Sequence, residues 1–68
     1  MIKENDLVVS VKTLQDGGIP VGTIGIVIDV YTMPIGYEVE FCINDKYVPV
    51  GCHSDEIALA KDRLQKAG

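Results

Sequence analysis

The chain has 68 residues, of which 47% are hydrophobic and 24% are charged, so it can form one globular domain and does not have the composition of a disordered segment. Its formal net charge is −4 and its six Lys and Arg residues form no basic run, which argues against nucleic acid as a direct ligand. Because the chain shows neither a signal-peptide pattern nor an apolar run long enough to span a bilayer, we expect a cytoplasmic protein with reduced thiols and no membrane attachment.

The first half of the chain predicts two strands separated by a long loop. Residues 7–12 alternate with a period of two, which is typical of a strand. Residues 13–22 contain Asp16-Gly17-Gly18 and Pro20, so we expect a loop there. We also expect Gly22 to allow a tight turn, through a conformation that a side chain would resist.

Residues 23–31, TIGIVIDVY, predict the second strand. Its alternation places four residues on one face, and we expect that face to be the core: Ile24, Ile26, Ile28 and Val30. The opposite face then carries Gly25, Val27, Asp29 and Tyr31. Gly25 is expected to be on that outer side, at a point where another part of the chain crosses closely.

Residues 37–43 and 46–52 predict a hairpin, with its turn at Asn44-Asp45, because both residues tolerate positive φ. This register places apolar residues opposite each other on the core side. Its pairs are Ile43 with Lys46, Cys42 with Tyr47, Phe41 with Val48, Glu40 with Pro49 and Val39 with Val50. Pro49 has no N–H and therefore predicts an edge strand or a bulge.

The preceding hairpin has its turn in TMPIG, marked by Pro34 and Gly36. Pairing Val30 with Tyr37 places Asp29 opposite Glu38. The same regular register would continue with Ile28 opposite Val39 and Ile26 opposite Phe41.

The C-terminal part of the chain, from residue 54, departs from the long strands predicted before it. Ser54 can cap a helical turn with Asp55 and Glu56 in its first turn, near residues 54–56. A short fifth strand is expected near 57–59, followed by a polar tail over 60–68 that is helical or frayed. The alternative is a helix lined by Ile57, Ala60 and Leu64.

Cys42, Cys52 and His53 are the only soft metal ligands in the sequence. A structural zinc site needs four ligands at paired spacings, and only three are present. Adjacent residues on a strand point to opposite faces, so Cys52 and His53 do not form a catalytic pair. We therefore expect no metal, no cofactor and no catalytic residue, with a metal-binding regulator as the weakest alternative.

Asp29, Glu38 and Glu40 are expected to gather on the outer face of the sheet. Tyr31 and Tyr47 fall on the same face or its rim, beside Pro49. Exposed tyrosines beside carboxylates suit a protein-binding surface. The plain alternative is a solvated face with ordinary edge packing.

The segments DLVVSVK, VGTIGIVIDVY, YEVEF and SDEIAL occur in the order of strands in an SH3-like barrel. Together they resemble a family of small bacterial domains of unknown function, with the pattern GxxGxVxxVY followed by YEVEF, over about residues 6–59. The resemblance implies a five-stranded SH3-like barrel as a single domain over residues 1–68, a bacterial origin and no established catalytic residue. The chain departs from the pattern at Asn44-Asp45, which lacks the usual Gly, and at PVGCHSDE.

Some members of that family resemble immunity or antitoxin proteins. The first functional hypothesis is therefore a non-enzymatic inhibitor whose acidic face covers a basic toxin or nuclease, with Asp29, Glu38 and Glu40 for charge and Tyr31 and Tyr47 as anchors. The second is a structural or accessory module that assembles with itself, as a homo-oligomer, or with a larger enzyme through a sheet edge.

Overall fold

The computed structural model describes residues 1–61, which form five antiparallel strands and one short 3₁₀ helix. The expected residues 62–68 of the polar tail, including Leu64, lie outside the described part. The strands are β1 (Leu7–Ser10), β2 (Ile24–Thr32), β3 (Ile35–Ile43), β4 (Lys46–Cys52) and β5 (Ile57–Leu59). The 3₁₀ helix η1 spans Asp16–Gly18.

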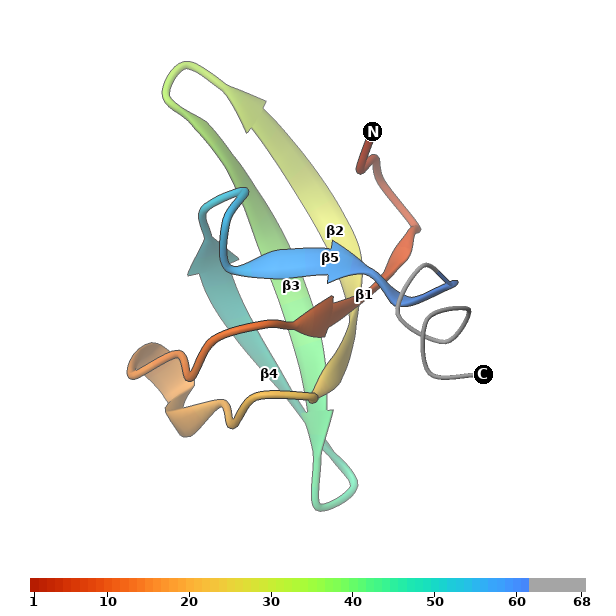
Figure 1. Ribbon diagram of the computed structural model, residues 1–68, viewed down its shortest axis with the longest axis vertical. Coiled ribbons are helices and arrows are strands. Elements are labelled where there is room, and N and C mark those ends of the chain that lie inside the picture. The colour runs from red at the N-terminus through yellow and green to blue at the C-terminus, as the bar shows by residue number, and fades with distance from the viewer. Residues whose placement is uncertain (62–68) are drawn as a thin grey trace.

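All five strands belong to one sheet in the order β4-β3-β2-β1-β5. In Figure 1 the long strands β2, β3 and β4 run side by side, and β1 and β5 cross in front of them. The two edge strands, β4 and β5, do not pair with each other, so the sheet is open. The mostly β architecture expected from the sequence is confirmed, whereas a closed barrel is not present.

The core lies between the β2–β4 layer and the crossing strands. Its centre is formed by fully buried side chains from three strands, namely Val8, Val27, Val39 and Phe41, together with Ile19 from the loop before β2. Leu14, Val50, Cys52 and Ile57 complete the buried cluster.

The β3–β4 hairpin has the predicted register throughout. Ile43 pairs with Lys46 and Val39 with Val50, and the pairing continues to Tyr37 with Cys52. Asn44 and Asp45 both have positive φ, 50° and 63°, as the two-residue turn requires. Pro49 lies on an edge strand, as predicted, where its missing N–H removes no bond from the ladder's interior.

The loop between β1 and β2 is folded back on itself and is held by Ser10. Leu14 and Ile19 exchange two backbone hydrogen bonds of 2.8 and 2.9 Å around η1. The buried Ser10 hydroxyl donates to the Pro20 carbonyl at 2.7 Å and accepts the Thr23 N–H at 3.0 Å. Gly22 has the predicted positive φ, 88°.

The segment before β5 forms a turn rather than the predicted helical turn at 54–56. The Glu56 N–H donates to the His53 carbonyl at 3.0 Å, and the Glu56 carboxylate accepts the His53 N–H at 2.8 Å. This closed pair of bonds ends the segment after one turn, and β5 follows directly over the expected residues 57–59.

Candidate functional site

A β-bulge in the middle of β2 determines which side chains reach the surface. Val30 pairs with Tyr37 and Asp29 with Glu38, as predicted, but Val27 then pairs with Val39, which leaves Ile28 without a partner. A bulge inserts one extra residue and shifts everything beyond it by one position. The regular register predicted for Ile28 and Ile26 is therefore wrong.

The bulge reverses the faces of the first half of β2. Val27 is fully buried and Gly25 is buried, whereas Ile24 is 45% and Ile28 41% exposed. The prediction that Ile24, Ile26 and Ile28 form the core is wrong, and only Val30, beyond the bulge, packs against it as predicted.

Gly25 is on the inner side rather than the predicted outer side, opposite Phe41 and Val8. The predicted close approach is present. A Cβ at Gly25 would lie 2.7 Å from a Val39 methyl carbon and 2.9 Å from a Phe41 ring carbon.

The surface turned away from the core therefore combines apolar and acidic side chains, and we call it the outer face. One cross-strand row runs over four strands, with Leu7 paired to Ile26, Ile26 to Glu40 and Glu40 to Pro49. The neighbouring row pairs Asp29 with Glu38 and Glu38 with Gly51. The outer face comprises Leu7, Ile24, Ile26, Ile28, Asp29, Tyr31, Glu38, Glu40, Cys42, Tyr47 and Pro49.

The structure brings the five predicted site residues to this face. Asp29 and Glu38 are directly opposite each other, and Glu40 is two residues along the same strand. Tyr31 is 46% exposed beyond Asp29, and Tyr47 is 69% exposed at the other end, opposite Cys42. The two tyrosines therefore mark opposite ends of the face rather than one cluster.

The carboxylates of the outer face have no cationic partner within residues 1–61. The ion pair in that part of the chain joins Lys12, after β1, to Asp55, before β5, at 2.8 Å. The Asp29 carboxylate accepts the N–H of Val30 at 2.9 Å, which holds it beside the bulge. A Cβ at Gly51 would lie 3.8 Å from Glu38 Oε1, so the Glu38 carboxylate extends over a residue without a side chain.

The exposed isoleucines are the part of this surface that the sequence prediction missed. Leu7, Ile24 and Ile28 are each more than 40% exposed beside the carboxylates. Large apolar side chains that gather on a surface and are rimmed by charges mark protein interaction sites. The sequence feature that could have revealed the bulged register is Gly25. A glycine opposite Phe41 leaves room for the ring, whereas Ile26 at that position, as the regular register predicts, would crowd it.

The thiols and the histidine do not converge. Cys42 is exposed on the outer face near the Asn44-Asp45 turn, whereas Cys52 is buried on the inner face at the far end of β4. Five pair positions separate them, roughly 15 Å along the strand. Burial raises the pKa of Cys52 to about 11, with smaller contributions from Glu56 and Glu38, so this thiol stays protonated at neutral pH.

Within residues 1–61 no group of three or more His, Cys, Asp or Glu side chains is placed to hold a metal ion. No helix in that range is long and apolar enough to cross a membrane.

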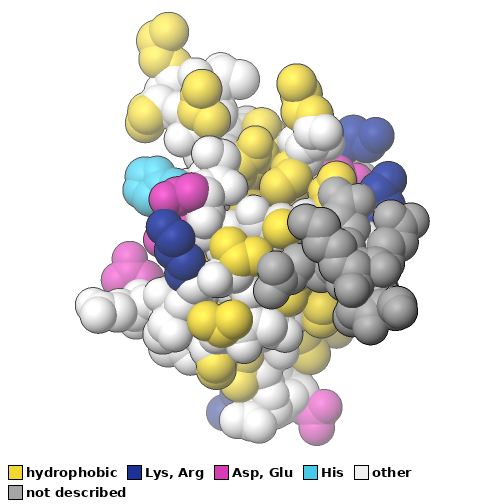
Figure 2. Space-filling model, viewed as in Figure 1, with side chains coloured by type: hydrophobic (Ala, Val, Ile, Leu, Met, Phe, Trp, Pro, Cys, Tyr) yellow, Lys and Arg dark blue, Asp and Glu magenta, His cyan; other side chains and the backbone are white. Residues whose placement is uncertain are grey.

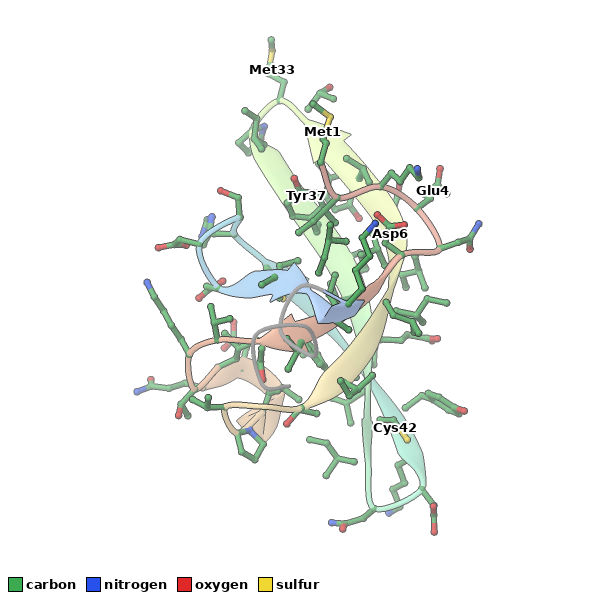
Figure 3. The ribbon with its side chains drawn as sticks, turned by 45° about the vertical axis from the view of Figure 1, so that its right-hand side comes forward. Met1, Glu4, Asp6, Met33, Tyr37 and Cys42 are labelled. Atoms are coloured by element: carbon green, nitrogen blue, oxygen red, sulfur yellow. The ribbon has the colours of Figure 1, made fainter. Side chains whose placement is uncertain are left out.

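A pocket of about 330 Å³ lies where the β2–β3 hairpin passes the end of β4. Tyr31, Ile35 and Tyr37 line it from the hairpin, and Cys52 and His53 from the end of β4. Figure 3 shows Tyr37 below the hairpin tip, which carries Met33, and Cys42 at the opposite end of the same hairpin pair. The pocket is thus separate from the row of Ile26 and Glu40.

No protein-family model matches this chain, and no curated protein or solved structure matches it significantly.

Proposed function

We propose that this chain is a non-enzymatic protein-binding module, and that its outer face binds a basic protein. Its specific form would be inhibition, in the manner of an immunity or antitoxin protein that covers a basic site of a toxin or nuclease. An SH3-like architecture is part of the proposal, supported by the strand order with β1 between β2 and β5.

The observation that carries the proposal is the combination of exposed isoleucines with carboxylates that have no cationic partner within residues 1–61. Ile24 and Ile28 supply apolar area that water would otherwise cover, about 25 cal/mol for each Å² removed from water. Asp29 and Glu38 lie beside Ile28, with no Lys or Arg partner in the described residues. Apolar contacts supply affinity, and carboxylates select a basic partner and speed its approach.

Like charges directly opposite each other are unfavourable in a sheet. The Asp29–Glu38 pair costs a few tenths of a kcal/mol while the surface is free. A cationic side chain placed between the two carboxylates would remove that cost, because it would interact with both. This argument favours Arg or Lys on the partner at this position.

The alternative, assembly through a sheet edge, has less support at β4. Strand addition needs a free row of backbone donors, and Pro49 removes one from the middle of this edge strand. An accessory module could still use the outer face, and the partner's identity distinguishes the two roles.

The test is capture from a lysate of the source cell, with four immobilised versions of the chain. Wild type and the control E4K are expected to retain the same basic protein, because Glu4 is exposed and is not on the outer face. The double variant E38K/E40K and the variant I28D are expected to lose it.

Association rates measured with the purified partner provide the quantitative readout. E38K/E40K should associate at least tenfold more slowly than wild type at low salt and depend less on salt. Inhibition of the partner's activity by wild type would support the immunity form. An acidic partner, or unchanged binding by E38K/E40K, would refute the proposal.

A further inference from the structure

The tip of the β2–β3 hairpin is a second apolar surface, which adjoins the outer face at Tyr31. Figure 1 shows this hairpin extending beyond the other strands, and Figure 2 shows hydrophobic side chains standing out at its end. Met33 is 94% and Ile35 68% exposed, the latter on the same side of β3 as the core residue Val39. We define the tip as residues 30–37.

Apart from its innermost pair, Val30 with Tyr37, the tip lacks support from neighbouring strands. The β4 partner of β3 ends at the pair of Tyr37 with Cys52, and β1 ends at the pair of Leu7 with Ile26. Residues beyond these pairs form a two-stranded ribbon, which is only marginally stable in water without cover. An apolar ribbon of this kind is stabilised when another surface packs on it.

The tip carries both projecting side chains and a hollow. The pocket of about 330 Å³ lies between the hairpin and the end of β4, with Tyr37 and Cys52 at its inner wall. Met33 and Ile35 also line it and are the most exposed of its large hydrophobic side chains. A two-fold contact requires such self-complementarity, because the same patch must serve on both sides.

The charge distribution of the chain favours a second copy of it as the partner of the tip. The sequence of the tip, VYTMPIGY, contains no charged residue, although the chain as a whole carries a net charge of −4. A basic partner would gain no electrostatic attraction there. Two copies of this acidic chain repel each other across most of their surfaces, and an uncharged apolar patch that projects from the body lets them meet with the least repulsion.

We propose that the tip binds a second copy of this chain, forming a two-fold dimer in which Met33 and Ile35 of each copy enter the pocket of the other. A patch confined to one hairpin end is small for a specific interface, so we expect the dimer to be weak and reversible. The outer face of each copy stays free except at Tyr31, which lines the pocket, so the dimer presents two partner-binding surfaces. This proposal does not depend on the function proposed for the outer face.

The test is sedimentation equilibrium from about 1 µM to 1 mM of the full chain, under reducing conditions because Cys42 is exposed. Wild type is expected to shift from one to two chains over this range. M33E and I35E place like charges across the two-fold axis and should raise the dimer Kd at least tenfold. V21E is the matched control, because Val21 is 53% exposed in the loop before β2.

Circular dichroism should show that all these variants keep the fold, since the substituted side chains are exposed. E38K/E40K, which tests the outer face, should dimerise at least as well as wild type. A wild-type chain that stays monomeric at 1 mM overturns the proposal. A dimer that M33E and I35E weaken no more than V21E overturns it as well.

Discussion

Asp29 lies directly opposite Glu38 across β2 and β3, immediately after the bulge. The two carboxylates face outward without a cation beside them in the described residues. Removing one charge should therefore stabilise the free protein while weakening its binding to a basic partner.

We expect E38Q to raise the free energy of unfolding by about 0.3–0.5 kcal/mol, because it removes the like-charge repulsion with Asp29. The measurement is urea denaturation at low salt, where the repulsion is least screened. The control E4Q neutralises an exposed carboxylate elsewhere and should change stability less. A lower stability for E38Q than for E4Q would show that the two carboxylates do not repel.

The bulge makes two adjacent residues respond differently to the same change. V27T places a hydroxyl in the core and should cost about 2 kcal/mol, since Val27 is fully buried. I28T changes an exposed side chain and should cost at most about 1 kcal/mol. Equal losses in urea denaturation, or a larger loss for I28T, would contradict the bulged register.

Gly25 and Gly51 form a similar pair of tests within strands. G25A should destabilise by about 2 kcal/mol or more, because its new methyl would meet the Glu40 carbonyl oxygen at 2.9 Å as well as two core side chains. G51A should be close to neutral, because its nearest neighbour is Glu38 Oε1 at 3.8 Å. Thermal unfolding of both variants checks the difference, and a G25A variant as stable as G51A would refute it.

Cys52 should make stability depend on alkaline pH. Its pKa is raised from 9.0 in the unfolded chain to about 11 in the folded one, so its contribution is fully present below pH 9 and is lost as the pH rises to 11. The loss is about 2 kcal/mol.

Lys and Tyr side chains also titrate in this range, so the measurement is the difference between wild type and C52A in urea denaturation at pH 8 and pH 10.5. C42S is the control, because Cys42 is exposed. The decline should be shallower in C52A and unchanged in C42S. In the native state a thiol reagent should modify Cys42 rapidly and Cys52 slowly, and parallel pH curves for wild type and C52A would contradict this account.

How much the sequence could predict differs between the two hairpins. The β3–β4 register followed from the Asn44-Asp45 turn, because a two-residue turn leaves only one pairing and the apolar residues then agree with it. The β2–β3 register followed only as far as Asp29 with Glu38. Beyond that point β2 is apolar on both faces, with Val27 between Ile26 and Ile28, so alternation could not reveal an inserted residue.

The acidic half of the outer face could be predicted because its residues lie where the predicted register is correct. Asp29 lies between the bulge and the hairpin turn, and Glu38 and Glu40 lie on β3. The apolar half could not, because Ile24 and Ile28 are typical core residues. The sequence predicts a turn over residues 32–36 of the hairpin tip. The apolar exposure of the tip follows from the lengths of β2 and β3 beyond their neighbours, which the sequence does not set.

The pairing of β1 with β5 has a consequence for how the chain folds. Val8 pairs with Leu59, near the two ends of the described chain, whereas β2, β3 and β4 pair with their sequence neighbours. Local contacts form before distant ones because less loop entropy is lost. We expect F41L to slow folding, with a φ-value near 1, and I57V mainly to speed unfolding, with a φ-value near 0, in stopped-flow chevron measurements.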